Sequence, residues 1–239
     1  MSQIRFIRHA QASFGKANYD QLSDFGFEQS TQLGIYFVKE KQHFDRIYVG
    51  PLRRQRETYE TVKAEYDKAG LSIPEPQFVD GLAEHRGPEV LRAVREQLIE
   101  KYDNVREWHE DTLQHPEKKI RNHFKMFNFF MMNWATKSLD IELPAHQDWQ
   151  SFKSAVHQAI QQIMTESGRG VTVGAFTSGG TISAIMGYAL EMKNEARIIE
   201  MNDAVINTSI SDFKYADGRL SMRQFNRVPH LQKEMITYV

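Results

Sequence analysis

An arginine and a histidine, Arg8 and His9, stand side by side near the start of the chain, directly after the short apolar run 4–7. The alternation of this run predicts a β-strand that carries both side chains at its carboxyl end. In open α/β sheets, ligands bind at that end of the strands. Arginine offers an anion a rigid fork of donors, and histidine offers a nitrogen nucleophile that titrates near neutral pH. The pair therefore predicts phosphate chemistry on a histidine.

Three other polar segments also follow predicted strands, namely 50–58 after 44–49, Glu84 after 78–79, and the Thr-Ser-Gly-Gly sequence 177–180 after the buried-type strand 171–176. The carboxyl ends of parallel strands meet at one edge of a sheet. We therefore expect all four segments at the same rim.

Helical patterns separate these strands. The predicted helices cover 25–41, with Ser23 or Asp24 as the N-cap, and then 54–68, 88–102, 151–167 and 179–192; two late strands are expected near 204–215 and 219–225. This alternation predicts an α/β fold, a three-layer α/β/α sandwich around a mostly parallel central sheet. The region 103–148 breaks the rhythm, so we interpret it as a helical insertion or cap in a single domain spanning 1–239.

The composition restricts the classes of function. The chain has 239 residues and a formal net charge of −1, which gives no general attraction to nucleic acid or to an anionic membrane surface. It contains no cysteine, which excludes thiol catalysis, disulfides and thiolate metal sites. We find no secretory signal pattern and no apolar run long enough to cross a bilayer, so a cytoplasmic location is expected.

The ordered segments resemble the histidine phosphatase superfamily, also called the phosphoglycerate mutase-like family. Four features carry the resemblance: Arg8-His9-Ala10 for the family's Arg-His-Gly, Arg54 within its Ser-Pro-Leu-x-Arg-Ala-x-Gln-Thr motif, residues 20–29 for its Asp-x-x-Leu-Thr-x-x-Gly-x-x-Gln stretch, and Leu82-x-Glu84 for its acid motif. The resemblance implies a phosphoglycerate mutase-like fold and a phosphomonoester hydrolase that needs neither a cofactor nor a metal.

It also implies a role for each matching residue. His9 would attack phosphorus and carry a phosphohistidine, while Arg8 and Arg54 would clamp the phosphate oxygens. Glu84 would protonate the departing alkoxide.

Ser178 departs from the family pattern, which has a histidine here in the sequence His-Gly-Gly. A serine donates a hydrogen bond but carries no charge, although Gly179 still lies at a helix N-terminus suited to phosphate. Losing such a donor is expected to slow turnover by roughly 10²–10³-fold. The alternative is therefore a phosphate-ligand binding or regulatory protein. A phosphomutase is a further alternative, disfavoured because Ser13 and Gly15 depart from the mutase loop.

The substrate is expected to be a small-molecule phosphoester, and its candidate contacts are Gln11, Ser13, His85 and Arg86. His85 is also a candidate to compensate for the missing histidine. The aromatic and Met-rich segment 124–134 is predicted to be a buried insertion helix, with a subunit interface in a homodimer or a substrate wall as alternatives.

Overall fold

The computed structural model describes residues 2–13, 20–144 and 148–238. In these residues the strands are β1 (Ser2–Arg8), β2 (Arg46–Val49), β3 (Pro76–Phe78), β4 (Thr172–Thr177), β5 (Ile210–Ala216) and β6 (Arg219–Arg227). They form one sheet in the order β3-β2-β4-β1-β5-β6. The strands from β3 to β1 are parallel, and β5 runs antiparallel to both β1 and β6. The mostly parallel sheet predicted from the sequence is confirmed.

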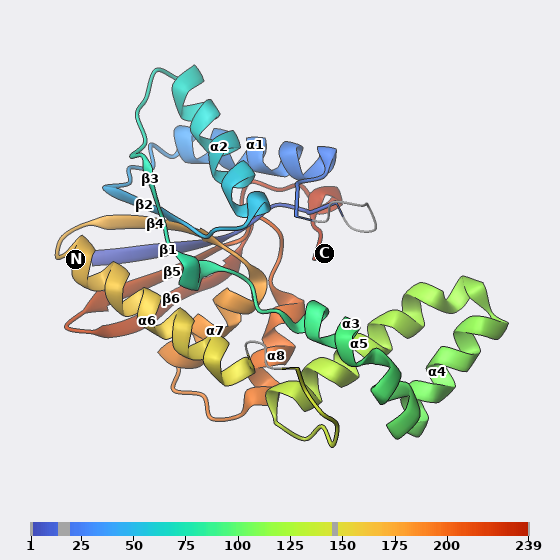
Figure 1. The fold of residues 1–239 in the computed structure, drawn as a ribbon. Coiled ribbons are helices and arrows are strands. Elements are labelled where there is room, and N and C mark those ends of the chain that lie inside the picture. The colour runs from blue at the N-terminus through green and yellow to red at the C-terminus, as the bar shows by residue number, and fades with distance from the viewer. Residues whose placement is uncertain (1, 14–19, 145–147, 239) are drawn as a thin grey trace.

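The helices are α1 (Asp24–Lys39), α2 (Arg53–Lys68), α3 (Gly87–Lys101), α4 (Asp103–Gln114), α5 (Lys119–Ala135), α6 (Trp149–Ser167), α7 (Gly179–Ala189) and α8 (Glu195–Ala204), with short 3₁₀ turns at Asp80–Leu82, Pro116–Lys118 and Lys233–Met235. Helices α1 and α2 cover one face of the sheet, and α6, α7 and α8 cover the other (Figure 1). Helices α3, α4 and α5 extend from the side where β1 ends, so the predicted insertion 103–148 supplies much of this arm (Figure 1).

Alternating residues of β1 bind the two helical layers to the sheet. Ile4 and Phe6 are fully buried in the larger apolar cluster, which includes residues of α6 and α7. Ile7 is buried on the other face, in the cluster with residues of α1 and α2. Because both faces of β1 are covered, the strand is fixed in the middle of the sheet, and the residues that follow it are placed at the centre of the rim.

The aromatic segment 124–134 forms most of α5. Met126, Phe130, Met131 and Trp134 are buried in the larger core cluster. Their spacing of four, one and three residues places them on one side of a helix. This burial matches the insertion helix favoured by the sequence, while homodimer formation stays a prediction.

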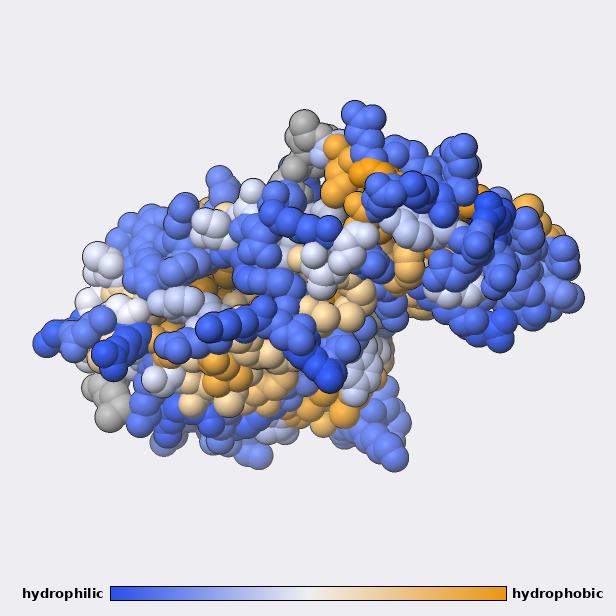
Figure 2. All heavy atoms as spheres, turned by 90° about the horizontal axis from the view of Figure 1, so that it is seen from below, coloured by the Kyte–Doolittle hydropathy of each residue, from blue (hydrophilic) through white to orange (hydrophobic). Residues whose placement is uncertain are grey.

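Seen from below, the arm is largely hydrophilic at its outer end, and apolar residues gather toward the middle of the molecule (Figure 2). No helix in the described ranges is long and apolar enough to cross a membrane.

The segment 190–209 differs from the sequence prediction. Helix α7 ends at Ala189 rather than near 192, and Ala204, expected to begin a strand, is the last residue of α8. The Asn194 side chain caps α8 by accepting from the Arg197 N–H at 3.3 Å. Only Ile198 and Ile199 are buried in α8, and so narrow an apolar stripe gives a weak helical pattern in the sequence.

Candidate active site

His9 lies directly beyond β1, at the centre of the rim. Its N–H donates to the Thr177 carbonyl oxygen of β4 at 2.8 Å. Its carbonyl oxygen accepts from the Thr208 N–H at 3.3 Å and from the Asn207 side-chain amide at 3.2 Å, both in the segment that leads into β5. The backbone of His9 is therefore held from both neighbouring strands.

The imidazole of His9 is fixed in one neutral form. Nδ1 lies 2.7 Å from the Ala10 carbonyl oxygen, which only accepts, so Nδ1 carries the proton. The other nitrogen, Nε2, accepts a hydrogen bond from Arg54 Nε at 3.0 Å. Burial, followed by the nearby charges of Arg54 and Arg8, lowers the pKa of His9 well below 6.5. At neutral pH His9 therefore presents an unprotonated Nε2, as a nucleophile must.

Arg54 occupies the first turn of α2 and is only 7% exposed. Besides its contact with His9, its Nη1 pairs with Asp20 Oδ1 at 2.7 Å. The second oxygen of Asp20 accepts from the Arg53 N–H at 3.0 Å. The Asp20 carboxylate therefore joins the N-terminus of α2 to the guanidinium that faces His9.

Arg8, the last residue of β1, brings the second cation. Its Nη1 donates to the Val205 carbonyl oxygen just after α8. A Cβ added to Gly179 would lie 3.4 Å from Arg8 Nε, so this guanidinium rests against the N-terminus of α7. The charges of Arg54 and Arg8 both contribute to the lowered pKa of His9, and Arg54 also donates directly to its ring.

Ser178 precedes α7 and is completely buried. Its Oγ accepts from Gln55 Nε2 at 2.8 Å, and the same amide nitrogen donates to the Leu82 carbonyl oxygen at 2.9 Å. The Ser178 hydroxyl keeps its own proton to donate. Through Gln55, the N-terminus of α7 is thus connected to the segment that carries Glu84.

Glu84 lies at the same helix N-terminus. Its Oε2 accepts from the Gly180 N–H at 3.1 Å, and its Oε1 accepts from the His85 N–H at 2.9 Å. Its side chain is 17% exposed, so the carboxyl group is open to the rim while both of its oxygens are held. The predicted acid is therefore positioned by the helix that also carries Ser178 and Gly179.

Residues 4–120 and 89–228 match the family model described as histidine phosphatase superfamily (branch 1). The chain belongs to the histidine phosphatase superfamily. A search of curated proteins finds no matching sequence.

Solved structures that are similar to this fold include phosphatases and a phosphoglycerate mutase. A phosphoserine phosphatase from Entamoeba histolytica, solved as a mutant with phosphoserine, aligns with a TM-score of 0.64 and 16% identity over 97% of this chain and 100% of that one. Phosphoglycerate mutase from Bacillus anthracis aligns with a TM-score of 0.56 and 17% sequence identity, over 94% of this chain and 92% of that one. A mycobacterial glucosyl-3-phosphoglycerate phosphatase aligns with a TM-score of 0.58 and 15% sequence identity, over 95% of this chain and 99% of that one. At these identities the likeness establishes the phosphoglycerate mutase-like fold.

The remaining candidates named from the sequence follow β1 and the 3₁₀ turn at Asp80–Leu82. Gln11 Oε1 accepts from the Ser23 hydroxyl at 2.9 Å, and the buried Ser13 donates to the Leu22 carbonyl oxygen at 3.0 Å. Arg86 is exposed just before α3, whereas His85 is buried behind Glu84. Gly15 lies outside the described residues.

Four polar residues that the sequence did not assign to the site support it: Asp20, Gln55, Thr58 and Asn207. Thr58 Oγ1 accepts from the Ala10 N–H at 3.0 Å and donates to the Arg54 carbonyl oxygen at 2.7 Å, joining the two motifs. Asp20, Gln55 and Thr58 fall within the motif segments, but their contacts depend on chain neighbours that only the fold brings together.

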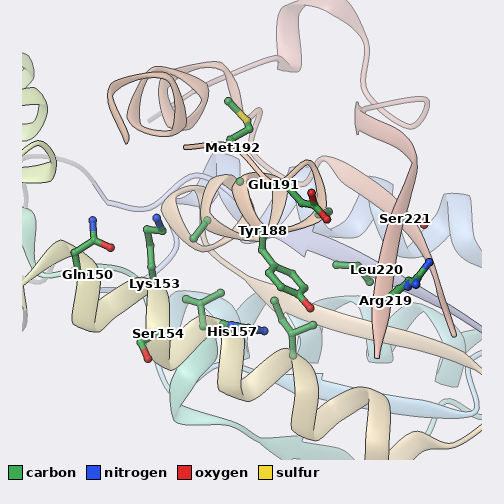
Figure 3. Close-up of a pocket in the computed structure, with 15 residues that line it drawn as sticks. Gln150, Lys153, Ser154, His157, Tyr188, Glu191, Met192, Arg219, Leu220 and Ser221 are labelled. Carbon is green, nitrogen blue, oxygen red and sulfur yellow. The ribbon is translucent and has the colours of Figure 1, made fainter. Parts of the chain in front are cut away.

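A separate cavity of about 680 Å³ lies between α6, the end of α7 and the start of β6. Lys153, His157, Tyr188 and Arg219 are among its lining side chains (Figure 3). None of the predicted site residues lines it, and the start of β6 lies at the opposite end of that strand from the rim. In the described part of the chain, no group of three or more His, Asp or Glu side chains is arranged to hold a metal ion.

Proposed function

We propose that the protein is a phosphomonoester hydrolase that forms a phosphohistidine on His9. The observation that carries this proposal is the neutral imidazole of His9, whose unprotonated Nε2 accepts from the buried Arg54 guanidinium and whose pKa is lowered by burial and by the charges of Arg54 and Arg8. Phosphoryl transfer depends mainly on positioning and on cations that stabilise the equatorial oxygens. In this proposal Arg54, which donates to His9 Nε2, supplies one such cation, and Arg8, the residue before His9, supplies the second.

In the first step, a phosphoester displaces Arg54 Nε from His9 Nε2 and draws that donor to a phosphate oxygen. Nε2 then forms a bond to phosphorus as the bond to the ester oxygen breaks. Glu84 gives its proton to the departing alkoxide, so a neutral alcohol leaves. In the second step, water attacks phosphorus, its proton returns to Glu84, and the bond from Nε2 to phosphorus breaks to release inorganic phosphate.

Within this proposal, Ser178 stands where the family places its second histidine. Its buried hydroxyl would donate to a phosphate oxygen, supported on the other side by Gln55. A neutral donor stabilises the transition state less than a charged one, so turnover is expected to be slow by roughly 10²–10³-fold relative to a site with the histidine.

Replacement of His9 tests the proposal. H9A should lower kcat for p-nitrophenyl phosphate by more than about 10³-fold, because the nucleophile is lost. The matched control is H43A, since the His43 side chain is 77% exposed and should be dispensable. Undiminished turnover by H9A would remove the proposal.

A phosphate-binding or regulatory protein is the second candidate, favoured by Ser178 and by the Asp20 carboxylate that already occupies one edge of Arg54. In that case the purified protein binds vanadate or tungstate but turns over no member of a broad phosphoester panel. Robust turnover by the wild type would exclude this candidate.

A further inference from the structure

The side chain of His85 is enclosed by aromatic rings. It is 3% exposed, and its ring centroid lies 6.1 Å from that of Trp134, 6.0 Å from Trp149 and 5.7 Å from Phe152. A polar ring in such surroundings loses its hydration, and that loss must be offset by contacts with the protein. The stability of the buried ring therefore depends on which protein groups its two nitrogens contact.

The tautomer of His85 follows from its neighbour Gly87. The Gly87 N–H donates to Nδ1 at 3.2 Å, so Nδ1 is the acceptor and the proton of the neutral ring is on Nε2. Nε2 is buried and has no hydrogen-bond partner among the described residues. It lies 3.6 Å from Oε1 of Glu84, just beyond hydrogen-bond distance. A small movement of the carboxyl group toward the ring would complete this bond.

Gly180 keeps Glu84 and His85 together at the N-terminus of α7. A Cβ at this position would lie 2.2 Å from Glu84 Oε1 and 2.5 Å from His85 Cδ2. Only a glycine leaves room for both side chains, while its N–H binds the other carboxyl oxygen. Glu84, His85 and Gly180 therefore pack as one unit, with Glu84 Oε1 3.6 Å from the buried Nε2.

We infer that His85 is a positioning residue for Glu84 and donates its Nε2–H to Oε1 when Glu84 gives up its proton; this inference rests on the proposed function. As the ester bond breaks, the Glu84 proton moves to the alkoxide and negative charge develops on the carboxylate. That charge is then shared by His85 Nε2–H and by the N–H groups of His85 and Gly180. His85 exchanges no proton itself and contacts no substrate.

Two phosphate esters with different leaving groups test this role. The p-nitrophenolate of p-nitrophenyl phosphate leaves without being protonated, whereas the alkoxide of an alkyl phosphate needs a proton from Glu84. H85F keeps a ring in the aromatic enclosure but removes the donor. It should lower kcat/KM for an alkyl phosphate by roughly 10–10²-fold and change kcat/KM for p-nitrophenyl phosphate by less than about threefold, because kcat/KM reports only the steps up to departure of the leaving group. E84Q should lower kcat/KM for the alkyl phosphate by at least as much, and the E84Q/H85F double variant should lose little more on that ester.

H85Q and H85N form a matched pair that keeps the experiment decisive if H85F folds poorly. Glutamine places an amide donor near the position of Nε2, whereas the shorter asparagine reaches only the Nδ1 position. H85Q should therefore restore alkyl phosphate turnover, and H85N should not. Thermal unfolding of both variants verifies that they are folded.

Equal losses with both kinds of ester, or no loss with either, would overturn the inference and leave the proposed function standing. Equal activity of H85Q and H85N on the alkyl phosphate would do the same. In contrast, full turnover by H9A, or none by the wild type, would overturn the proposed function and the inference with it.

Discussion

Ser178 shows how one side chain can change the character of the site. Its Oγ is completely buried and already accepts from Gln55, so the one donor it can offer a phosphate oxygen is its hydroxyl proton. The hydroxyl adds no positive charge to those of Arg8 and Arg54. At the scale of single residues, the candidate site combines a neutral, fixed His9 imidazole with one uncharged donor at Ser178.

Loss of the Ser178 hydroxyl should have a measurable effect on turnover. S178A is expected to lower kcat by roughly 10–10²-fold, because the transition-state phosphate loses one hydrogen bond. S178H should raise kcat above the wild type while reducing the free energy of unfolding by about 1–3 kcal/mol, because a larger ring must displace the Gln55 amide. Steady-state kinetics and chemical denaturation measure both effects.

S183A is the control for S178A, since Ser183 is also a buried serine but lies within α7 and donates to the Gly179 carbonyl oxygen. Identical kinetics of S178A and the wild type would show that the Ser178 hydroxyl does not contact phosphate.

Helix α7 organises the site at the scale of elements. Its first turn touches Arg8 through Gly179 and Glu84 through Gly180, while Ser178 precedes it. A helix N-terminus also favours an anion through its exposed N–H groups and its dipole. The close contacts in this turn require residues without a Cβ.

A methyl group at Gly180 should therefore disrupt the site. G180A is expected to lower kcat/KM for alkyl phosphates by roughly 10²-fold, because Glu84 is pushed away from its productive position. The free energy of unfolding should fall by about 1–3 kcal/mol.

G187A provides the same substitution on the same helix. There the added Cβ meets the end of the flexible Ile198 side chain, so stability should fall while turnover is retained. Wild-type activity of G180A would contradict the tight packing of Glu84 and His85 against α7.

At the scale of the whole molecule, two buried histidines couple stability to pH. Burial lowers the pKa of His230 to about 4, and burial with two arginines lowers that of His9 well below 6.5. Between pH 6.5 and 4 the unfolded chain binds protons at these positions that the folded protein does not. Stability therefore rises with pH in this window and is lost as the pH falls.

The free energy of unfolding should thus decrease from pH 6.5 to pH 4, with His230 contributing up to about 3 kcal/mol. H230Q removes this titration and can still bond to Thr208, which lies 2.9 Å from His230 Nε2. Urea denaturation at several pH values should show a shallower dependence for H230Q than for the wild type. An unchanged slope would show that His230 does not control it.

The sequence by itself determined the strand-to-helix alternation, the mostly parallel sheet and the four motif segments at its rim. These features depend on local pattern, because apolar periodicity and the residues that follow a strand can be identified without knowing what packs nearby. Helix α8 was missed because its buried stripe consists of two isoleucines.

Only the tertiary structure decided how the side chains work together. The ion pair of Asp20 with Arg54 joins positions 34 residues apart, and the bond between Gln55 and Ser178 joins positions 123 apart. The enclosure of His85 by α5 and α6 likewise depends on the packing of separate helices. Protonation states and hydrogen-bond partners depend on neighbours in space, and sequence patterns record neighbours along the chain.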